Sequence, residues 1–154
     1  MKDAKRVISE CKKLKIRTTG FFIIGHPGET KETIEKTIAC TLDIPFDDIV
    51  VTINTPIPGT IQYNEVTKYW VLDSSNWDDF NYWSPVFIPF GLDKDYLLRK
   101  QRELYRKFYF RPKIICRLLL DLVSPTGITR LKSYMLGLQY LIKNKNNYKS
   151  WNDR

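Results

Sequence analysis

The residues of this chain that could take part in chemistry begin with a Gly-His-Pro-Gly segment at positions 25–28, which holds the only histidine, His26. An unperturbed histidine titrates near neutral pH, so His26 could in principle act as a general base. It has no neighbouring serine, cysteine or second histidine with which to form a triad or a metal set. We therefore favour a loop or supporting role for His26 over catalysis, and we assign no catalytic residue.

The three cysteines, Cys11, Cys40 and Cys116, are too far apart to form a disulfide framework or a zinc site. Each falls at an apolar position of a helical pattern. We therefore expect reduced, buried thiols in a reducing compartment, and no metal ligand among them. This expectation places the protein in the cytoplasm, either free or peripheral to a membrane.

The chain has 154 residues and a formal net charge of +8, with a composition close to that of an ordinary globular domain. The charge is uneven, because residues 93–154 carry 15 basic and 5 acidic side chains. We expect three parts with different roles: an α/β part over residues 1–70, an irregular aromatic linker over 71–92 and a basic helical extension over 93–154.

The hydrophobic pattern of the first part alternates between helical and strand periods. It predicts a helix over 2–15, a strand over 17–25, a helix from 30 to 42, a strand over 47–54 and a short helix over 60–69. Alternating helices and strands are typical of βα units around a parallel sheet. The unbroken apolar run 21–24 and the β-branched run 49–53 predict strands that are buried on both faces.

The region after residue 70 is predicted to be loop and then helix. An extended piece is expected at 86–88, a helix capped by Asp93 as far as Phe108, a second helix from Arg111 and a third from Ser124. Two strands alone do not make a stable sheet. Either a partner supplies the rest of the sheet, or the chain is the carboxyl-terminal piece of a longer protein, which is the alternative we favour.

Two motifs carry a family resemblance: Phe21-Phe22-Ile23-Ile24-Gly25-His26-Pro27-Gly28-Glu29-Thr30, and Thr55-Pro56-Ile57-Pro58-Gly59-Thr60. At this separation they resemble the late part of the radical S-adenosylmethionine domain, in the branch with cobalamin-binding members and methylthiotransferases. The segment 108–112 is similar to the helical end of the cobalamin-binding members. The resemblance implies the last βα units of a partial, TIM-like (β/α) barrel, followed by a helical extension.

The resemblance also implies where a cofactor would lie. Ile23 would offer an apolar contact to the adenine of S-adenosylmethionine, and Gly25, Pro27 and Gly28 would shape the turn beside it. Ile53, Asn54 and Thr55 would flank the same adenine from the next strand. Glu29 is expected to brace the loop and to take no part in the chemistry. These residues follow the strands at the carboxyl edge, where parallel α/β folds bind ligands.

The family's iron–sulfur motif, Cys-x-x-x-Cys-x-x-Cys, does not occur in this chain. A [4Fe-4S] cluster is normally held by cysteine thiolates, so its ligands, like those of any cobalamin, would lie in an amino-terminal barrel half outside this sequence. We therefore expect the fragment to contribute the adenine-side wall for a radical methyl transfer or a related reaction, without being competent alone.

The basic segment 93–154 leaves a different class of function open. Its Arg and Lys side chains alternate with aromatic residues, which suits contacts to RNA or to an anionic membrane surface. A solvated face over a helical core is the plain alternative. A non-enzymatic basic helical module that binds lipid or nucleic acid is therefore the competing hypothesis.

Overall fold

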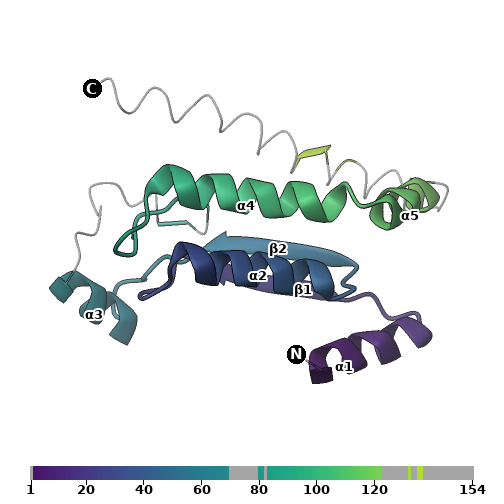
Figure 1. Cartoon of the computed structure of the whole chain (residues 1–154), viewed down its shortest axis with the longest axis horizontal. Helices are drawn as coiled ribbons and strands as arrows, with labels where there is room; N and C mark the ends of the chain where they lie inside the picture. The colour runs from purple at the N-terminus through teal and green to yellow at the C-terminus, as the bar shows by residue number, and fades with distance from the viewer. Residues whose placement is uncertain (1, 70–79, 82, 123–131, 133–134, 137–154) are drawn as a thin grey trace. The chain divides into compact units, whose positions relative to one another are not determined.

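The chain forms an α/β structure in a computed structural model, which describes residues 2–69, 80–81, 83–122, 132 and 135–136 (Figure 1). Within these ranges the elements are α1 (Lys2–Lys13), β1 (Thr19–Ile24), α2 (Lys31–Asp43), β2 (Asp48–Ile53), α3 (Ile61–Tyr69), α4 (Lys94–Tyr109) and α5 (Pro112–Leu122). The expected order of helices and strands is confirmed. The helix expected from Ser124 lies largely outside the described residues.

The chain divides into two compact units, Met1–Phe110 and Arg111–Arg154. The first contains both strands and the helices α1 to α4. It therefore includes the first helix of the basic segment. The second unit contains α5, and each unit is described by itself.

The two strands pair in parallel, in a register that runs from Thr19 opposite Asp48 to Ile24 opposite Ile53. Helix α2 begins at an N-cap, Thr30, whose side chain accepts a hydrogen bond from the Thr33 N–H. Such a cap satisfies a donor at the helix start that has no partner within the helix. The connection from β1 through α2 to β2 is thus a βαβ unit, as the sequence predicts.

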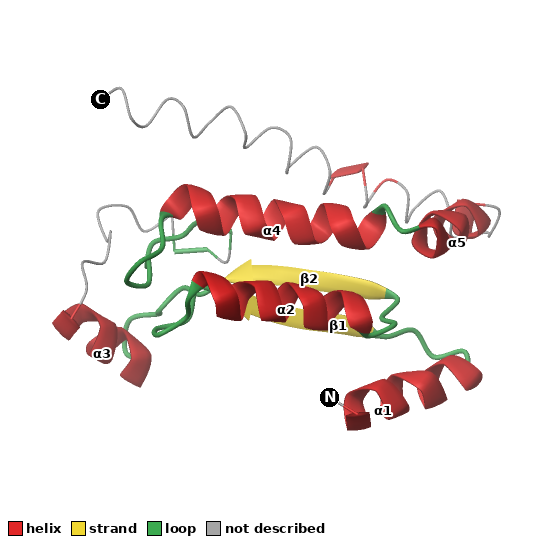
Figure 2. Ribbon diagram, viewed as in Figure 1, coloured by secondary structure: helices red, strands yellow, loops and turns green. Residues whose placement is uncertain are grey.

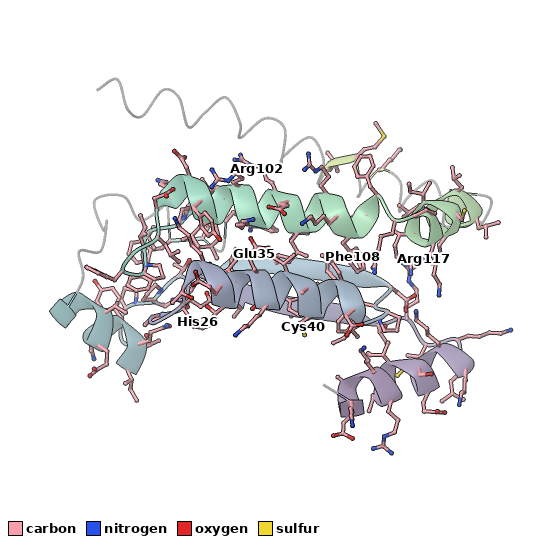
Figure 3. The ribbon with its side chains drawn as sticks, viewed as in Figure 1. His26, Glu35, Cys40, Arg102, Phe108 and Arg117 are labelled. Carbon is pink, nitrogen blue, oxygen red and sulfur yellow. The ribbon has the colours of Figure 1, made fainter. Side chains whose placement is uncertain are left out.

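One face of the sheet is covered by helices of the first unit: α2 packs on β1, α4 packs on β2, and the two helices touch each other (Figure 2). Figure 3 shows Phe108 on the sheet side of α4 and Arg102 on the opposite side. The fully buried side chains of this layer come from both strands and both helices: Ile24, Ile34, Val51, Ile53, Leu97, Leu104 and Phe108. This layer is the hydrophobic core of the unit.

The opposite face of the sheet is open, which corrects the expectation that both strands are buried on both faces. Phe21 is 76% exposed and Ile23 is 48% exposed, while Val50 and Thr52 on β2 are half-buried. Successive side chains of a strand point to opposite faces. Because helices cover only one of these faces in the described residues, alternate side chains of β1 are left in contact with solvent.

Helix α1 has an apolar stripe but no buried residue. Val7 and Leu14 are exposed, and Ile8 and Cys11 are half-buried. Its link to the rest of the unit includes an ion pair from Lys5 to Asp43 of α2, at 2.5 Å. The amphipathic pattern predicts the helix correctly, yet no described residue covers its stripe completely.

The cysteines, residues 86–88 and the start of α4 test three further expectations. Cys116 is exposed and Cys11 and Cys40 are half-buried, so the prediction of buried thiols is wrong for Cys116 and holds only partly for the others. Residues 86–88 form loop and no strand, although Val86 and Phe87 are buried. The expected cap of α4 is confirmed, because the Asp93 carboxylate accepts a hydrogen bond from the Tyr96 N–H at 2.6 Å.

Among the described residues, none of the helices is both long enough and apolar enough to cross a lipid bilayer.

Candidate functional site

The turn after β1 is held in a fixed shape by its glycines and by one carboxylate. Gly25 and Gly28 have φ angles of 86° and 81°, a left-handed conformation that costs other residues roughly 1–2 kcal/mol. The Glu29 side chain accepts hydrogen bonds from the N–H groups of Gly25 and His26, the latter at 3.0 Å. The predicted bracing role of Glu29 is confirmed, and the turn has a defined backbone surface at the carboxyl end of β1.

Asn54 lies directly beside this turn. Its backbone N–H donates to the carbonyl of Ile24 at 2.8 Å and so extends the parallel pairing by one residue. Its side chain is only 6% exposed, and its Oδ1 accepts a hydrogen bond from Gln62 of α3 at 3.3 Å. The Asn54 Nδ2 is buried and has no hydrogen-bond partner in the described part of the chain.

An unpaired amide donor in this position is costly, because a buried polar group without a partner loses about 1–3 kcal/mol of hydration free energy. Exchanging the nitrogen and oxygen of Asn54, together with those of Gln62, would preserve their mutual hydrogen bond. It would then leave the Asn54 oxygen unpaired at the same point. With either assignment, one end of the buried Asn54 amide has no hydrogen-bond partner among the described residues.

The neighbours of Asn54 have structural partners. The Ile53 side chain is completely buried, and a Cβ built on Gly25 would lie 3.6 Å from it and 3.5 Å from Leu97. The hydroxyl of Thr55 donates to the Asn81 carbonyl at 2.9 Å and thereby ties the end of β2 to a later loop. From Ile53 and Thr55, backbone groups are therefore better placed than side chains to reach a ligand.

The remaining residues that the sequence nominates lie on two sides of this edge. Ile23 is on the open face of the sheet, and Pro27 is exposed within the glycine turn. The structure brings Gly25 and Asn54 together and places Ile23 on the face opposite to Ile53. Gln62, which contacts Asn54, was not predicted, because no local pattern signals a hydrogen bond between a strand end and a later helix.

The family's metal centre does not fit this chain. Cys11, Cys40 and Cys116 belong to three different helices. No group of three or more His, Cys, Asp or Glu side chains that could hold a metal ion occurs within the described ranges. His26 is exposed at the glycine turn. The unpaired end of the Asn54 amide is chemically compatible with adenine, which carries both ring-nitrogen acceptors and an amino donor.

A network of ion pairs connects α2 and α4, the two helices that cover the sheet. Lys100 of α4 pairs with Glu35 of α2 and, at 2.8 Å, with Glu103. Lys107 adds a second contact to Glu103 at 2.5 Å. Hydrogen bonds from Lys100 and Lys107 lower the pKa of Glu103 to about 2, and the bonds that Lys100 donates to Glu103 and Glu35 raise the pKa of Lys100. The network stabilises the arrangement of α2 and α4.

The described residues form an α/β segment with a rigid glycine turn at the carboxyl end of β1. The known proteins to which the chain is similar are methyltransferases and cyclases, which supports a radical S-adenosylmethionine-like family. No protein-family model matches the chain. The chain is 31% identical over 110 residues to an uncharacterized methyltransferase of Pyrococcus horikoshii, a match that covers 71% of this chain and 24% of the relative.

Two other relatives are a cyclase and a second methyltransferase. An anaerobic magnesium-protoporphyrin IX monomethyl ester cyclase of Cereibacter sphaeroides is 30% identical over 110 residues, which cover 71% of this chain and 17% of the relative. A bacteriochlorophyllide d C-12(1)-methyltransferase of Chlorobaculum tepidum is 25% identical over 118 residues, covering 77% and 25%. The chain thus spans a quarter or less of the length of these curated relatives.

Proposed function

We propose that this chain is the carboxyl-terminal segment of a radical S-adenosylmethionine enzyme and supplies the adenine-side wall of its S-adenosylmethionine site. In this proposal β1 and β2 are the last strands of a partial (β/α) barrel. The missing amino-terminal half, in the same polypeptide or in a split subunit, holds the [4Fe-4S] cluster and any cobalamin. The chemistry supplied there is a methyl transfer or a related carbon-centred radical reaction.

The observation that carries the proposal is the buried amide of Asn54, one end of which has no partner among the described residues, beside the rigid turn at Gly25. Adenine offers ring-nitrogen acceptors, and the left-handed turn presents backbone without a side chain in the way. The carboxyl edge of a parallel sheet is the usual place for such a ligand. Similarity to methyltransferases and a cyclase supports the same class of cofactor.

The chain alone can be tested for adenine recognition. In ¹⁵N-labelled protein titrated with millimolar S-adenosylmethionine, we expect the amide signals of Gly25 and the side-chain amide of Asn54 to shift. Asn54→Ala should weaken the interaction by about tenfold, the value of one hydrogen bond of roughly 1–1.5 kcal/mol. Asn64→Ala, an exposed asparagine on α3, is the matched control.

The cofactor's adenosine part must be responsible for these shifts. Adenosine should reproduce them at the same residues, and uridine should not. Equal shifts with uridine, or an unchanged affinity in Asn54→Ala, would contradict the proposal.

A second candidate function rests on the outward surface of α4. Arg99, Arg102 and Arg106 are exposed at spacings of three and four residues, so they form one basic stripe. This stripe suits an anionic membrane surface or RNA. However, the opposite side of α4 is packed on β2, which argues against a module that folds without residues 1–70.

The basic stripe can be tested with the whole chain. Binding to anionic and to neutral vesicles, each at two salt concentrations, would detect a membrane role, and a labelled RNA oligonucleotide in the same buffers would detect an RNA role. Indifference to lipid charge would remove the first, and RNA binding that does not weaken with salt would argue against the second.

A further inference from the structure

The two edges of the sheet can be told apart by their hydrogen bonds. In a parallel pair, successive peptide groups of a strand point alternately to the neighbour and to the outer edge. The N–H of Asp48 donates to Thr18 at 3.1 Å and that of Asn54 to Ile24 at 2.8 Å, so even-numbered residues of β2 face β1. The peptide groups that face the outer edge belong to the others: Ile49, Val51 and Ile53.

Side chains of α4 close this outer edge at its centre. The Val51 N–H donates to the hydroxyl oxygen of Tyr105 at 2.8 Å, and the Val51 carbonyl accepts from Gln101 at 2.8 Å and from the Tyr105 hydroxyl at 3.3 Å. Gln101 is buried, and burial raises the pKa of the Tyr105 hydroxyl. Both groups that another strand would need at Val51 are therefore occupied.

The protection is weaker on either side of Val51. The Ile49 N–H donates to the Asp48 carboxylate at 2.9 Å, and the same carboxylate accepts a hydrogen bond from the Tyr109 hydroxyl, which lies 3.5 Å from the Ile49 carbonyl. The Ile53 carbonyl lies 3.3 Å from the Thr55 hydroxyl, whose shorter hydrogen bond goes to Asn81. Side chains thus occupy the outer edge of β2 most fully at its centre, a strong way to prevent edge-to-edge pairing.

The outer edge of β1 has no such protection. By the same alternation, its outward peptide groups belong to Thr19, Phe21 and Ile23. No hydrogen bond reaches these three residues from any part of the chain that the structure describes. Phe21 and Ile23 also carry the exposed apolar side chains of the open face. An unpaired and apolar strand edge is a site at which another strand can add.

Helix α1 indicates the direction of the added strand. It enters β1 with an apolar stripe that includes Val7 and Ile8 and has no buried residue. Strands that follow one another in the chain are neighbours in the sheet about two-thirds of the time, and a helical crossover between two parallel strands is almost always right-handed. Such a strand would pair with β1, and its sheet would give the stripe of α1 a surface to pack on.

We propose that Gln101, Tyr105 and Tyr109 protect the outer edge of β2 and so act as an edge guard. The sheet can then accept a further strand only at the outer edge of β1, and that strand is the parallel strand that α1 connects to β1. The edge guard does not depend on the adenine site, whereas the occupant, a strand of the missing barrel half, rests on the proposed function. The strand belongs to the three quarters or more of the relatives' length that this chain does not span.

The edges can be tested by sedimentation velocity, with a second copy of the chain as the probe strand. One free edge allows pairing to stop at a dimer, whereas two free edges allow open-ended growth. We expect a weak dimer for the wild type and larger oligomers for the variant Gln101→Leu/Tyr105→Phe. Phe21→Pro, which removes an outward N–H in each copy, should weaken the dimer by about tenfold or more.

Each variant needs a folded control, which circular dichroism and the exchange rate of the Val51 amide provide. Ile23→Lys, a charge on the same edge, is the second variant if Phe21→Pro does not fold. Open-ended growth of the wild type, no growth in the double variant, or a dimer unaffected by both β1 variants would overturn the proposal. A wild-type dimer that persists at nanomolar concentration would make a second copy the occupant and would overturn it too.

The parallel strand itself can be tested in a chimaera, in which residues 2–110 replace the matching segment of the first methyltransferase relative. We expect the amides of Phe21 and Ile23 to exchange at least about 100-fold more slowly than in the isolated chain, because a neighbouring strand protects them. If this chimaera does not fold, the cyclase relative serves as the second host. A folded chimaera in which these amides exchange as fast as in the isolated chain would overturn the proposal.

Discussion

The two faces of β1 carry similarly apolar side chains but have different surroundings. On the helix-covered face of the sheet, Ile24 and Val51 are buried, while on the open face Phe21 is 76% exposed. Exposed and buried or half-buried side chains alternate along β1. On this strand the difference lies in what covers each face, whereas the open face of β2 is itself more polar, with Asp48 and Thr52.

This comparison shows that an apolar strand sequence indicates that its side chains are buried in the final assembly. It does not indicate which chain or segment covers them. Burying a large apolar side chain contributes roughly 1.5–3 kcal/mol. The first unit therefore obtains this stabilisation from one face only. The open face would contribute to stability only in an assembly with a larger sheet, which is the arrangement that the proposed function requires.

The largest expected effect comes from truncating the covered face. Leu97 is completely buried and lies beneath Gly25 and Ile53. Leu97→Ala should lower the free energy of unfolding by about 2–5 kcal/mol, because the lost contacts leave a cavity. Urea denaturation followed by circular dichroism measures the change.

Ile23→Ala on the open face is the matched control. We expect it to cost less than about 1 kcal/mol in the isolated chain, since little area is removed from contact. Equal losses of unfolding free energy for Leu97→Ala and Ile23→Ala would show that the open face is covered in solution and would contradict the difference between the two faces.

The sequence predicts those parts of the fold that depend on local patterns. The strand runs, the N-caps at Thr30 and Asp93, and the glycine turn follow from residue types within a few positions of one another. Their causes are backbone conformation and helix ends, which neighbouring residues determine. The resemblance then added Asn54 to the candidate site, although it gave no indication that its amide lacks a partner.

The sequence does not predict features that depend on distant contacts. The bonds from Gln101 and Tyr105 to Val51 join residues about fifty positions apart, and no periodicity in either segment encodes them. The exposure of Phe21 was missed for the opposite reason, since an apolar strand indicates burial but does not say which chain supplies the cover. The exposed Cys116 is a similar case on a helix.

The glycine turn lies where the covered face meets the candidate site, and its two glycines can be compared by substitution. Gly25→Ala and Gly28→Ala should each lower the free energy of unfolding by about 1–2 kcal/mol, because both φ angles are positive. A Cβ at Gly25 would make ordinary contacts with Leu97 and Ile53, and one at Gly28 would meet nothing within 4 Å.

If conformation alone sets the cost, the two losses should agree within about 0.5 kcal/mol, the usual scatter of such measurements. Denaturant midpoints of the two variants decide this. A much larger loss for Gly25→Ala would mean that the core layer beneath the turn is packed too tightly to accept a methyl group.

The smallest expected effect concerns the ion network that joins the helices of the covered face. Lys100 and Glu103 are only 15% and 20% exposed, and the pKa of Glu103 is lowered to about 2 from an ordinary 4.5. A carboxylate whose pKa is lower in the folded state stabilises the fold above its unfolded pKa. That stability should disappear as the pH falls from about 5 to about 2, and should amount to about 1 kcal/mol or less.

The difference in unfolding free energy between wild type and Glu103→Gln, measured across this pH range, isolates the contribution of Glu103. It should be positive near neutral pH and approach zero near pH 2, where Glu103 is increasingly protonated in the folded state as well. Glu10→Gln is the control, because Glu10 pairs with Lys13 on the exposed surface of α1, where such a pair contributes little. A pH-independent difference for Glu103→Gln would show that α2 and α4 are held together by the apolar layer alone, and that the covered face needs no charge to keep its helices in place.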